Sequence, residues 1–404
     1  VSVGHGNQEI ISAISNQIKQ ISFTYGFADN IPRQKLAKKL DEWSPEGMGH
    51  TKTIFSSSGA EANESAIKLS YQYHQERGNV NKTKIVGRWQ SYHGNTVSTL
   101  SIGGRSSWRS KFNSLLHDSL HISPPYCYRC SSTDSHSSCA ENFANELKKI
   151  IQREGAENIS AFIAEPIIGT SMSAVVPPKG YYEIIRNICD ENDILFIADE
   201  VMSGMGRTGK KWGIDHWNVS PDIITTSKGI GAGYSPISAA IFSEKVWGAI
   251  SSGSGSTTHS STYGGNPLSC AVGCAVIDYI EKNDLISNAE VMGEKLISKL
   301  NEELSDIPYV GDIRGKGLLI GIEIVSDKVS KAIFDPKLDL AHKIEAEARK
   351  NGLIILSGVP GLVDGVGGDH LELCPPYIIN DDHVEFIVSI LKKSILETIS
   401  SINL

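Results

Sequence analysis

Two apolar runs rich in β-branched residues dominate the hydrophobic pattern in the middle of the chain. Residues 194–198 read ILFIA and residues 222–226 read DIITT. Neither run alternates apolar with polar positions, which predicts strands buried on both faces of a parallel sheet. The first run leads into Asp199, and the second leads into Lys228. Because the carboxyl ends of neighbouring parallel strands meet at one edge of a sheet, we expect a carboxylate and an amine at a shared ligand-binding edge.

Strand patterns and helix patterns alternate along most of the chain. Asn7 precedes isoleucines at helical spacing, which predicts a capped helix. Residues 53–74 predict a short strand, a turn of small residues and an amphipathic helix. Further buried strands are predicted to end near Tyr92 and at Glu165. The pattern favours an α/β fold, with a mainly parallel central sheet flanked by helices and a smaller α+β domain.

The size and charge of the chain narrow the possible functions. The 404 residues are 40% apolar, enough for a large core, and the formal net charge of −8 offers no basic field for nucleic acid or anionic lipid. No apolar run approaches the roughly 20 residues of a membrane helix, and no targeting signal is evident. Seven cysteines, an odd number, suit a reducing compartment, so we expect a cytoplasmic protein.

A cluster of cysteines raises the question of a metal site. Cys127 and Cys130 form a Cys-x-x-Cys pair, with Cys139, His121 and His136 nearby in the sequence. A Cys-x-x-Cys pair can supply half of a tetrahedral zinc site, but the second half is poorly formed here. We expect ordinary loop thiols and no metal, with structural zinc as the alternative.

The residues around Lys228 suggest a chemical role for it. Glycines follow at positions 229, 231 and 233, and low bulk would let a flat ligand approach closely. A lysine amine can bond covalently to an aldehyde, and a buried aspartate can keep the ring nitrogen of pyridoxal phosphate protonated. The alternative is a salt-bridged Asp199 and a surface lysine.

Two segments together resemble a known enzyme family. DEVMSGMGRTG, starting at Asp199, and PDIITTSKGIGAGYSP, which contains Lys228, are similar to the signature of class III (subgroup II) aminotransferases. The resemblance extends over almost the whole chain and implies fold type I, pyridoxal phosphate as cofactor, and Lys228 and Asp199 as catalytic residues. It favours the omega-amino acid:pyruvate enzymes, because Met202 stands where ornithine and GABA aminotransferases place Gln.

The same resemblance implies a set of cofactor contacts. Helix-start residues would bind the phosphate, an aromatic ring and a valine would hold the two faces of the cofactor ring, and a threonine would reach the neighbouring subunit's phosphate, which implies a homodimer with shared active sites. In this chain these contacts, with two weaker candidates beside the cofactor, fall on Ser58, Gly59, Ala60, Tyr92, His93, Glu165, Val201 and Thr262.

Substrate contacts are less well defined by the sequence. Phe23, Tyr25 and Phe27 alternate, as in a half-buried extended segment, and the resemblance makes the first two candidates for the substrate pocket. Many relatives carry an arginine ahead of the x-P-P segment to hold a carboxylate, but residues 357–377 contain none. Arg105 or Arg109 could take that role.

The resemblance also suggests domain boundaries and alternatives in function. We expect residues 1–45 to form an N-terminal segment of the small domain and active-site rim, with an upstream part missing, residues 46–280 the large cofactor domain, and residues 281–404 the small domain. An aminomutase or racemase of the same fold would use the same lysine and aspartate. A catalytically idle cofactor-binding dimer is a further alternative.

Overall fold

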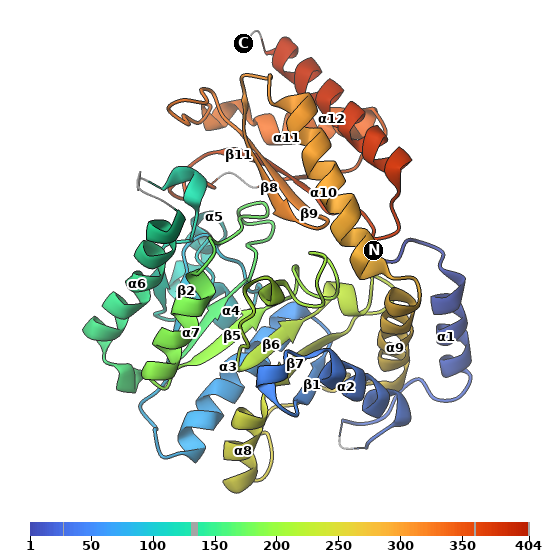
Figure 1. Ribbon diagram of the computed structural model, residues 1–404. Coiled ribbons are helices and arrows are strands. Elements are labelled where there is room, and N and C mark those ends of the chain that lie inside the picture. Colours follow the sequence, from blue (N-terminus) through green and yellow to red (C-terminus); the bar gives the residue numbers. More distant parts are fainter. Residues whose placement is uncertain (27, 131–135, 359–360, 403–404) are drawn as a thin grey trace.

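The computed structural model describes residues 1–26, 28–130, 136–358 and 361–402. Phe27, which the sequence placed in one extended segment with Phe23 and Tyr25, lies outside the described residues. A seven-stranded sheet occupies the lower part of the molecule in Figure 1, and a four-stranded sheet the upper part. This arrangement confirms the α/β class predicted from the sequence.

The large sheet is parallel through most of its width. Its strand order is β1-β7-β6-β5-β4-β2-β3, and only the pairs of β7 with β6 and with β1 are antiparallel. The strands are β1 (Lys52–Ser56), β2 (Lys84–Arg88), β3 (Leu120–Ile122), β4 (Ile159–Ala164), β5 (Leu195–Asp199), β6 (Ile223–Thr226) and β7 (Ser238–Phe242).

The two central strands are buried on both faces, as their unbroken apolar runs predict. On β5, Leu195 and Ile197 pack in one apolar cluster with α3, whereas Phe196 and Ala198 pack in another with α7. Both clusters are closed by helices that contact the sheet from opposite sides. The helices of this part are α3 (Gly59–Glu76), α4 (Val97–Ile102), α5 (Ser106–Arg109), α6 (His136–Glu154), α7 (Tyr181–Glu191), α8 (Glu244–Ser252) and α9 (Pro267–Lys282).

The N-terminal helices pack beside α9. Helix α1 (Gln8–Ile18) begins where the sequence predicts, because the Asn7 side chain accepts hydrogen bonds from the Glu9 and Ile10 amides. Both α1 and α2 (Ile31–Trp43) contact α9 (Figure 1). The domain boundaries after residues 45 and 280 stay predictions.

The small sheet is antiparallel, in the order β10-β11-β9-β8. It is covered by helices from the C-terminal part of the chain, with the longest of them at the top of Figure 1. Its elements are α10 (Leu285–Leu304), β8 (Val310–Lys316), β9 (Leu319–Ile324), α11 (Leu340–Lys350), β10 (Leu356–Ser357), β11 (Asp369–Leu373) and α12 (Asp381–Ser401).

Arginine side chains join the two sheets through main-chain carbonyls. Arg314 on β8 donates to the Met172 and Ser173 carbonyls at 2.8 and 2.9 Å, and Arg207 donates to the Leu318 and Pro375 carbonyls at 3.0 and 2.6 Å. Arg314 also pairs with Asp312 and Glu323, so it is structural. The small sheet is thereby held over the loops that follow the large one.

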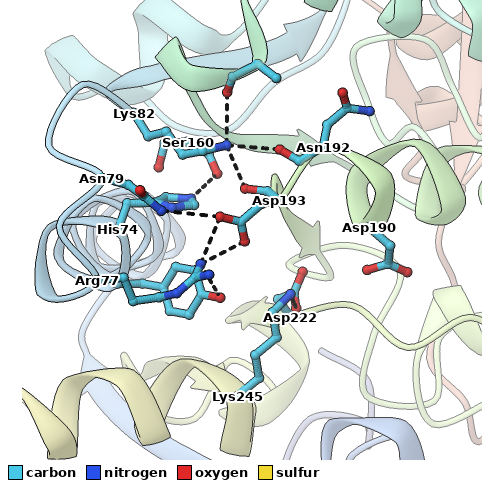
Figure 2. A network of polar contacts seen from close by, with 12 residues as sticks. His74, Arg77, Asn79, Lys82, Ser160, Asp190, Asn192, Asp193, Asp222 and Lys245 are labelled. Atoms are coloured by element: carbon cyan, nitrogen blue, oxygen red, sulfur yellow. Dashed lines mark hydrogen bonds and ion pairs between the residues drawn. The ribbon is translucent and has the colours of Figure 1, made fainter.

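A polar network secures the amino ends of the central strands, as Figure 2 shows. The Lys82 ammonium donates to the carbonyls of Ala156, Ile159, Asn192 and Asp193 at 2.9, 3.4, 3.0 and 2.8 Å. These carbonyls belong to the turns that lead into β4 and β5. One buried ammonium group therefore satisfies four main-chain acceptors.

Replacing Lys82 tests the strength of this anchor. Lys82→Met keeps the aliphatic length but leaves four acceptors without their donor, and we expect the free energy of unfolding to fall by about 3 kcal/mol. Lys84→Met is the matched control, because Lys84 forms only a half-exposed pair with Glu154 and should cost under about 1 kcal/mol. Urea unfolding of both variants measures the difference; equal losses would contradict the anchor.

His74 gives the same network a pH dependence. Its side chain is buried, Nε2 lies 3.0 Å from the Ser160 carbonyl, and burial lowers the pKa of His74 to about 4. The unfolded chain takes up this proton near the ordinary pKa of 6.5, whereas the folded chain resists it. Stability contributed by the neutral ring is therefore lost as the pH falls from about 6.5 towards 4.

Urea unfolding at pH 7.5 and pH 5 checks this sign. The variant His74→Gln keeps a neutral donor towards Ser160 but has no proton to gain, so its deficit relative to the unmodified protein should shrink in acid. A deficit that is the same at both pH values would show that His74 does not titrate with unfolding.

Candidate functional site

A cavity of about 1030 Å³ opens at the carboxyl ends of the central strands. It is bounded by the start of α3, the turns after β2, β4 and β5, and the segment around α5. Many residues predicted from the sequence line it together, namely Ser58, Gly59, Ala60, Tyr92, His93, Glu165, Asp199, Val201 and Lys228. Five other candidates do not line it in this single chain, namely Phe23, Tyr25, Arg105, Arg109 and Thr262.

Asp199 ends β5 as a buried carboxylate, only 3% exposed. Its Oδ2 accepts from Asn63 Nδ2 at 2.8 Å and lies 2.7 Å from His93 Nδ1, and its Oδ1 accepts from the Val201 amide at 3.1 Å. The carboxylate is thus held by contacts from three separate segments of the chain. The Oδ1 atom keeps a further lone pair for a proton-bearing group in the cavity.

Lys228 follows β6 and reaches the same cavity. The registers of β5 and β6 set Asp199 opposite Thr225, so the carboxylate and the amine leave adjacent strands. Lys228 adopts φ 35°, in the left-handed region, and its side chain is exposed within the cavity. A non-glycine residue held in that region is strained, which is common where a side chain must be aimed at a ligand.

The glycines after Lys228 serve the protein's own packing, which corrects the reason given from the sequence. A Cβ at Gly231 would lie 2.2 Å from the Ser235 carbonyl oxygen, and one at Gly229 would lie 2.7 Å from Met205 Cβ. These positions face neighbouring protein atoms. They therefore do not serve to admit a flat ligand; they let the turn fold tightly under Lys228.

The start of α3 offers main-chain donors, as predicted. Ser58 caps the helix in a capping box with Glu61, whose carboxylate accepts from the Ser57 and Ser58 amides at 2.8 and 3.0 Å. The Gly59 and Ala60 amides precede the first helical bond and have no acceptor among the described residues. They form the positive end of an 18-residue helix, and this end can bind an anion.

Tyr92 and Val201 both line the cavity. From the sequence, they were expected to hold the two faces of a flat cofactor ring. The Tyr92 ring packs edge-on against Trp108, with ring centroids 4.7 Å apart. Val201 fills the space next to Gly59, where an added Cβ would lie 3.0 Å from Val201 Cγ1. Gly59 thus lets the helix start approach the valine.

The two other carboxylates of the site are held by amides. Glu165 accepts from the Tyr92 and Gly169 amides at 3.1 and 2.8 Å, and burial raises its pKa. It therefore fixes the Tyr92 backbone. Glu200 points away from the cavity and accepts from the Gly213 and Ile214 amides, and burial raises the pKa of Glu200 to about 7.

The aromatic candidates lie beside the predicted intersubunit threonine. Phe23 contacts Tyr25 and Tyr263, each with ring centroids 5.5 Å apart. Tyr25 and Tyr263 are both 63% exposed, and Thr262 is exposed as well. Two segments far apart in the sequence thus form one aromatic surface, and their predicted roles in a neighbouring subunit's site stay predictions.

The two candidate arginines have different surroundings. Arg109 donates through Nη1 to the Ser101 and Gly103 carbonyls at 2.7 and 2.5 Å, which closes the end of α4. Arg105 is 1% exposed, and none of its three guanidinium nitrogens has a partner among the described residues. Its guanidinium carbon lies 5.1 Å from the centroid of the Trp108 ring, which lines the cavity.

Sequence reasoning missed several residues of the site. Asn63 donates to Asp199 and to the His93 carbonyl at 2.7 Å, and accepts from Thr225 Oγ1 at 2.7 Å. The only signal was an amide next to the apolar stripe of α3. The apolar wall also went unpredicted; it comprises Val97, Leu100, Trp108, Phe112, Leu115 and Leu116.

In the described part of the chain, the cysteine cluster does not form a metal site. Cys127, Cys130 and Cys139 are free thiols, and no group of three or more described His, Cys, Asp or Glu residues could hold a metal ion. His121 stacks on Trp89 and bonds main-chain atoms instead. The His136 side chain lies outside the described part.

Comparison with known proteins gives concordant matches over nearly the whole chain. The Aminotransferase class-III family matches residues 1–395. The uncharacterized aminotransferase YodT of Bacillus subtilis is 38% identical over 395 residues, covering 98% of this chain and 88% of that protein. Taurine–pyruvate aminotransferase of Bilophila wadsworthia is 34% identical over 402 residues, covering 98% and 85%.

A solved structure agrees in fold. The (S)-enantioselective omega-transaminase from Thermomicrobium roseum superposes with a TM-score of 0.91 at 33% identity, covering 98% of this chain and 86% of that one. Within the described residues, none of the helices has the length and apolar character needed to span a membrane.

Removing Asn63 tests the support of Asp199. Asn63→Ala deletes the Nδ2 donor, and the loss of a charge-assisted hydrogen bond should weaken binding of pyridoxal phosphate by about 10- to 100-fold. Titration of the cofactor followed by visible absorbance measures this. Asn79→Ala is the matched control, because Asn79 lies in the network of Figure 2, and its affinity should match that of the unmodified protein. Equal affinities for all three proteins would contradict the role of Asn63.

Proposed function

Since the chain belongs to the class III aminotransferase family, we propose that it transfers an amino group from an amine or omega-amino acid to a 2-oxo acid, with pyruvate as acceptor and pyridoxal phosphate as cofactor. Membership confirms the family resemblance, the fold type I class and the aminotransferase activity predicted from the sequence. The observation that carries the proposal is the pairing of β5 with β6, which brings Asp199 and Lys228 to one cavity.

The residues of the cavity fit the proposed cofactor. The free amides of Gly59 and Ala60 suit its phosphate, and the Asp199 carboxylate suits its protonated ring nitrogen. Tyr92 and Val201 supply the two apolar faces that a flat ring needs. Lys228 would hold its aldehyde carbon. The bound cofactor supplies an electron-accepting ring that stabilises negative charge on the carbon beside the substrate amine.

Four residues would then take part in the proton chemistry. Once the substrate amine has displaced the Lys228 Nζ atom from the aldehyde carbon, the freed amine would take the proton from the substrate carbon that bears the amine and, as a general acid, would return it to the former aldehyde carbon of the cofactor. Asp199 holds a proton on the ring nitrogen, and Asn63 and His93 hold Asp199. Their hydrogen bonds fix the carboxylate in one orientation throughout the reaction.

The cavity wall bears on the choice of amine. Its apolar part, around Phe112 and Leu115, suits a hydrocarbon chain or ring. Met202 also lines the cavity, in the position that favoured a pyruvate enzyme from the sequence. Taurine–pyruvate aminotransferase supports pyruvate as the acceptor, and the omega-transaminase supports an amine or omega-amino acid as the donor.

We also propose a cytoplasmic homodimer with shared active sites. The exposed aromatic surface of Phe23, Tyr25 and Tyr263 supports it, because exposed aromatic rings are enriched where proteins associate. Thr262 lies within this surface and would contribute to the partner's site. Reaction balance separates transamination from an aminomutase or racemase, because only transamination consumes the 2-oxo acid.

Borohydride trapping tests the proposal directly. The protein incubated with pyridoxal phosphate and then reduced should carry one stable adduct, mapped by mass spectrometry to Lys228. Lys228→Ala should carry none and should lose roughly 10²–10⁴-fold or more in amino transfer, because the base is gone. Lys245→Ala, a lysine paired with Asp222 away from the cavity, should keep both adduct and activity.

Substrate panels complete the test. Amine donors are paired with pyruvate or with 2-oxoglutarate, and consumption of the 2-oxo acid is followed. A protein that forms the Lys228 adduct but consumes neither acceptor with any donor is not the proposed aminotransferase; it would match the idle dimer or, if the amine moves within its own molecule, an aminomutase.

A further inference from the structure

Arg105 is a buried cation without a counter-ion in the described chain. It is 1% exposed, and its Nε, Nη1 and Nη2 atoms all lack a partner among the described residues. An arginine in that state is energetically unfavourable, because the guanidinium is buried and has gained no described hydrogen-bond acceptor. In line with this cost, burial alone lowers the pKa of Arg105 to about 10.

The neighbour of Arg105 on β11 is a buried histidine and not a counter-ion. His370 on β11 is fully buried, its Nδ1 atom has no described partner, and the positive charges of Arg105 and Arg314 add to burial in lowering the pKa of His370 to about 3. None of the ion pairs in the described part of the chain includes Arg105. A bound anion would therefore supply the acceptors that the described residues do not give to Arg105.

Arg105 lies directly behind the wall of the substrate cavity. On one side its guanidinium packs on Trp108, which lines the cavity. On the other side its neighbour His370 lies 3.3 Å from the Thr170 carbonyl, and Thr170 and Ser171 line the cavity as well. The Ser171 hydroxyl is another buried polar atom without a described partner. Arg105 thus lies beside residues that line the cavity, although it does not line the cavity itself.

We propose that Arg105 is the residue that binds the substrate carboxylate, with the Trp108 ring turning aside to admit it and the Ser171 hydroxyl as a second donor. The inference rests on the proposed function, and it names the substrate class: a 2-oxo acid acceptor, and any donor that carries a carboxylate. Bidentate pairing of a guanidinium with a carboxylate supplies two parallel hydrogen bonds and removes the unpaired charge.

Two other cations do not meet the same need. Arg109 already donates to the Ser101 and Gly103 carbonyls and lies 3.1 Å from His121 Nε2. Lys111 lines the cavity but is exposed and keeps its water. Pairing a carboxylate with Arg105 relieves a cost that binding at Arg109 or Lys111 would not.

Kinetics of the holoenzyme separate carboxylate recognition from catalysis. With one carboxylate-free amine donor, kcat/KM is measured for pyruvate and for propanal, which lacks the carboxylate. Arg105→Met should lower kcat/KM for pyruvate by about 10- to 100-fold and leave that for propanal within about twofold. Arg105→Lys should recover part of the loss, since it restores the charge without the fork.

Binding and stability give a readout that does not depend on turnover. Propanoate, added against chloride at equal ionic strength, should raise the melting temperature of the unmodified holoenzyme but not that of Arg105→Met. Without propanoate, Arg105→Met should be at least as stable as the unmodified protein, because it removes an unpaired charge. Arg109→Met should be destabilised, because it leaves carbonyls of α4 without donors.

Several outcomes would overturn the proposal. These are equal losses with pyruvate and propanal, destabilisation of Arg105→Met as large as that of Arg109→Met, or a pyruvate-selective loss reproduced by Lys111→Met. Borohydride trapping of Lys228 in Arg105→Met keeps the two ideas apart. If the unmodified protein forms no adduct, the proposed function fails, while the propanoate measurement still decides whether Arg105 binds a carboxylate.

Discussion

The burial of the Asp199 carboxylate is the constraint on which the rest of the site depends. A carboxylate that is 3% exposed needs donors, and here they come from three separate segments: Asn63 of α3, His93 of the turn after β2, and the Val201 amide beyond β5. Satisfying one charge therefore fixes the start of α3 relative to the aromatic turn. The amides of Gly59 and Ala60, which we propose bind the phosphate, and Tyr92, which we propose stacks on the ring, follow from that fixed geometry, because they lie near these donors in the chain.

The amino and carboxyl ends of the central strands differ in whether their polar groups have partners within the protein. At the amino ends, Lys82 donates to main-chain carbonyls (Figure 2), and Asp222 pairs with Arg186 and with Lys245. At the carboxyl ends, donors and acceptors are left facing a cavity, including the amides of Gly59 and Ala60. Polar groups that face a cavity without a partner are groups to which a ligand can bind favourably. The rigid amino ends hold the strands in register, so that the open ends keep their spacing.

The sequence predicted the features that depend on local pattern. Unbroken apolar runs identified β5 and β6, because strands covered on both faces have no polar side, and the capped start of α3 followed from Ser58 and the small residues after it. The apolar pattern alone does not separate Asp199 from Glu200, and the family resemblance was what identified Asp199. In the fold, Asp199 lines the cavity and Glu200 points away from it. Asn63 was missed for a similar reason: an amide beside an apolar stripe has no distinctive pattern until the strand opposite it is known. The glycines after Lys228 were found correctly, but their reason, close approach to Ser235 and Met205, required the fold.

Arg105 and Arg109 show why residue type alone cannot assign a role. They lie four positions apart at one short helix, and from the sequence they are equivalent candidates for a carboxylate. In the fold, Arg109 reaches the carbonyls at the end of α4, whereas Arg105 is buried with every guanidinium nitrogen unpartnered among the described residues. A buried donor with partners stabilises the fold, and one without them costs stability that a ligand can restore. Donor satisfaction, rather than distance from the cavity alone, is therefore the physical property that distinguishes a structural arginine from one suited to bind substrate.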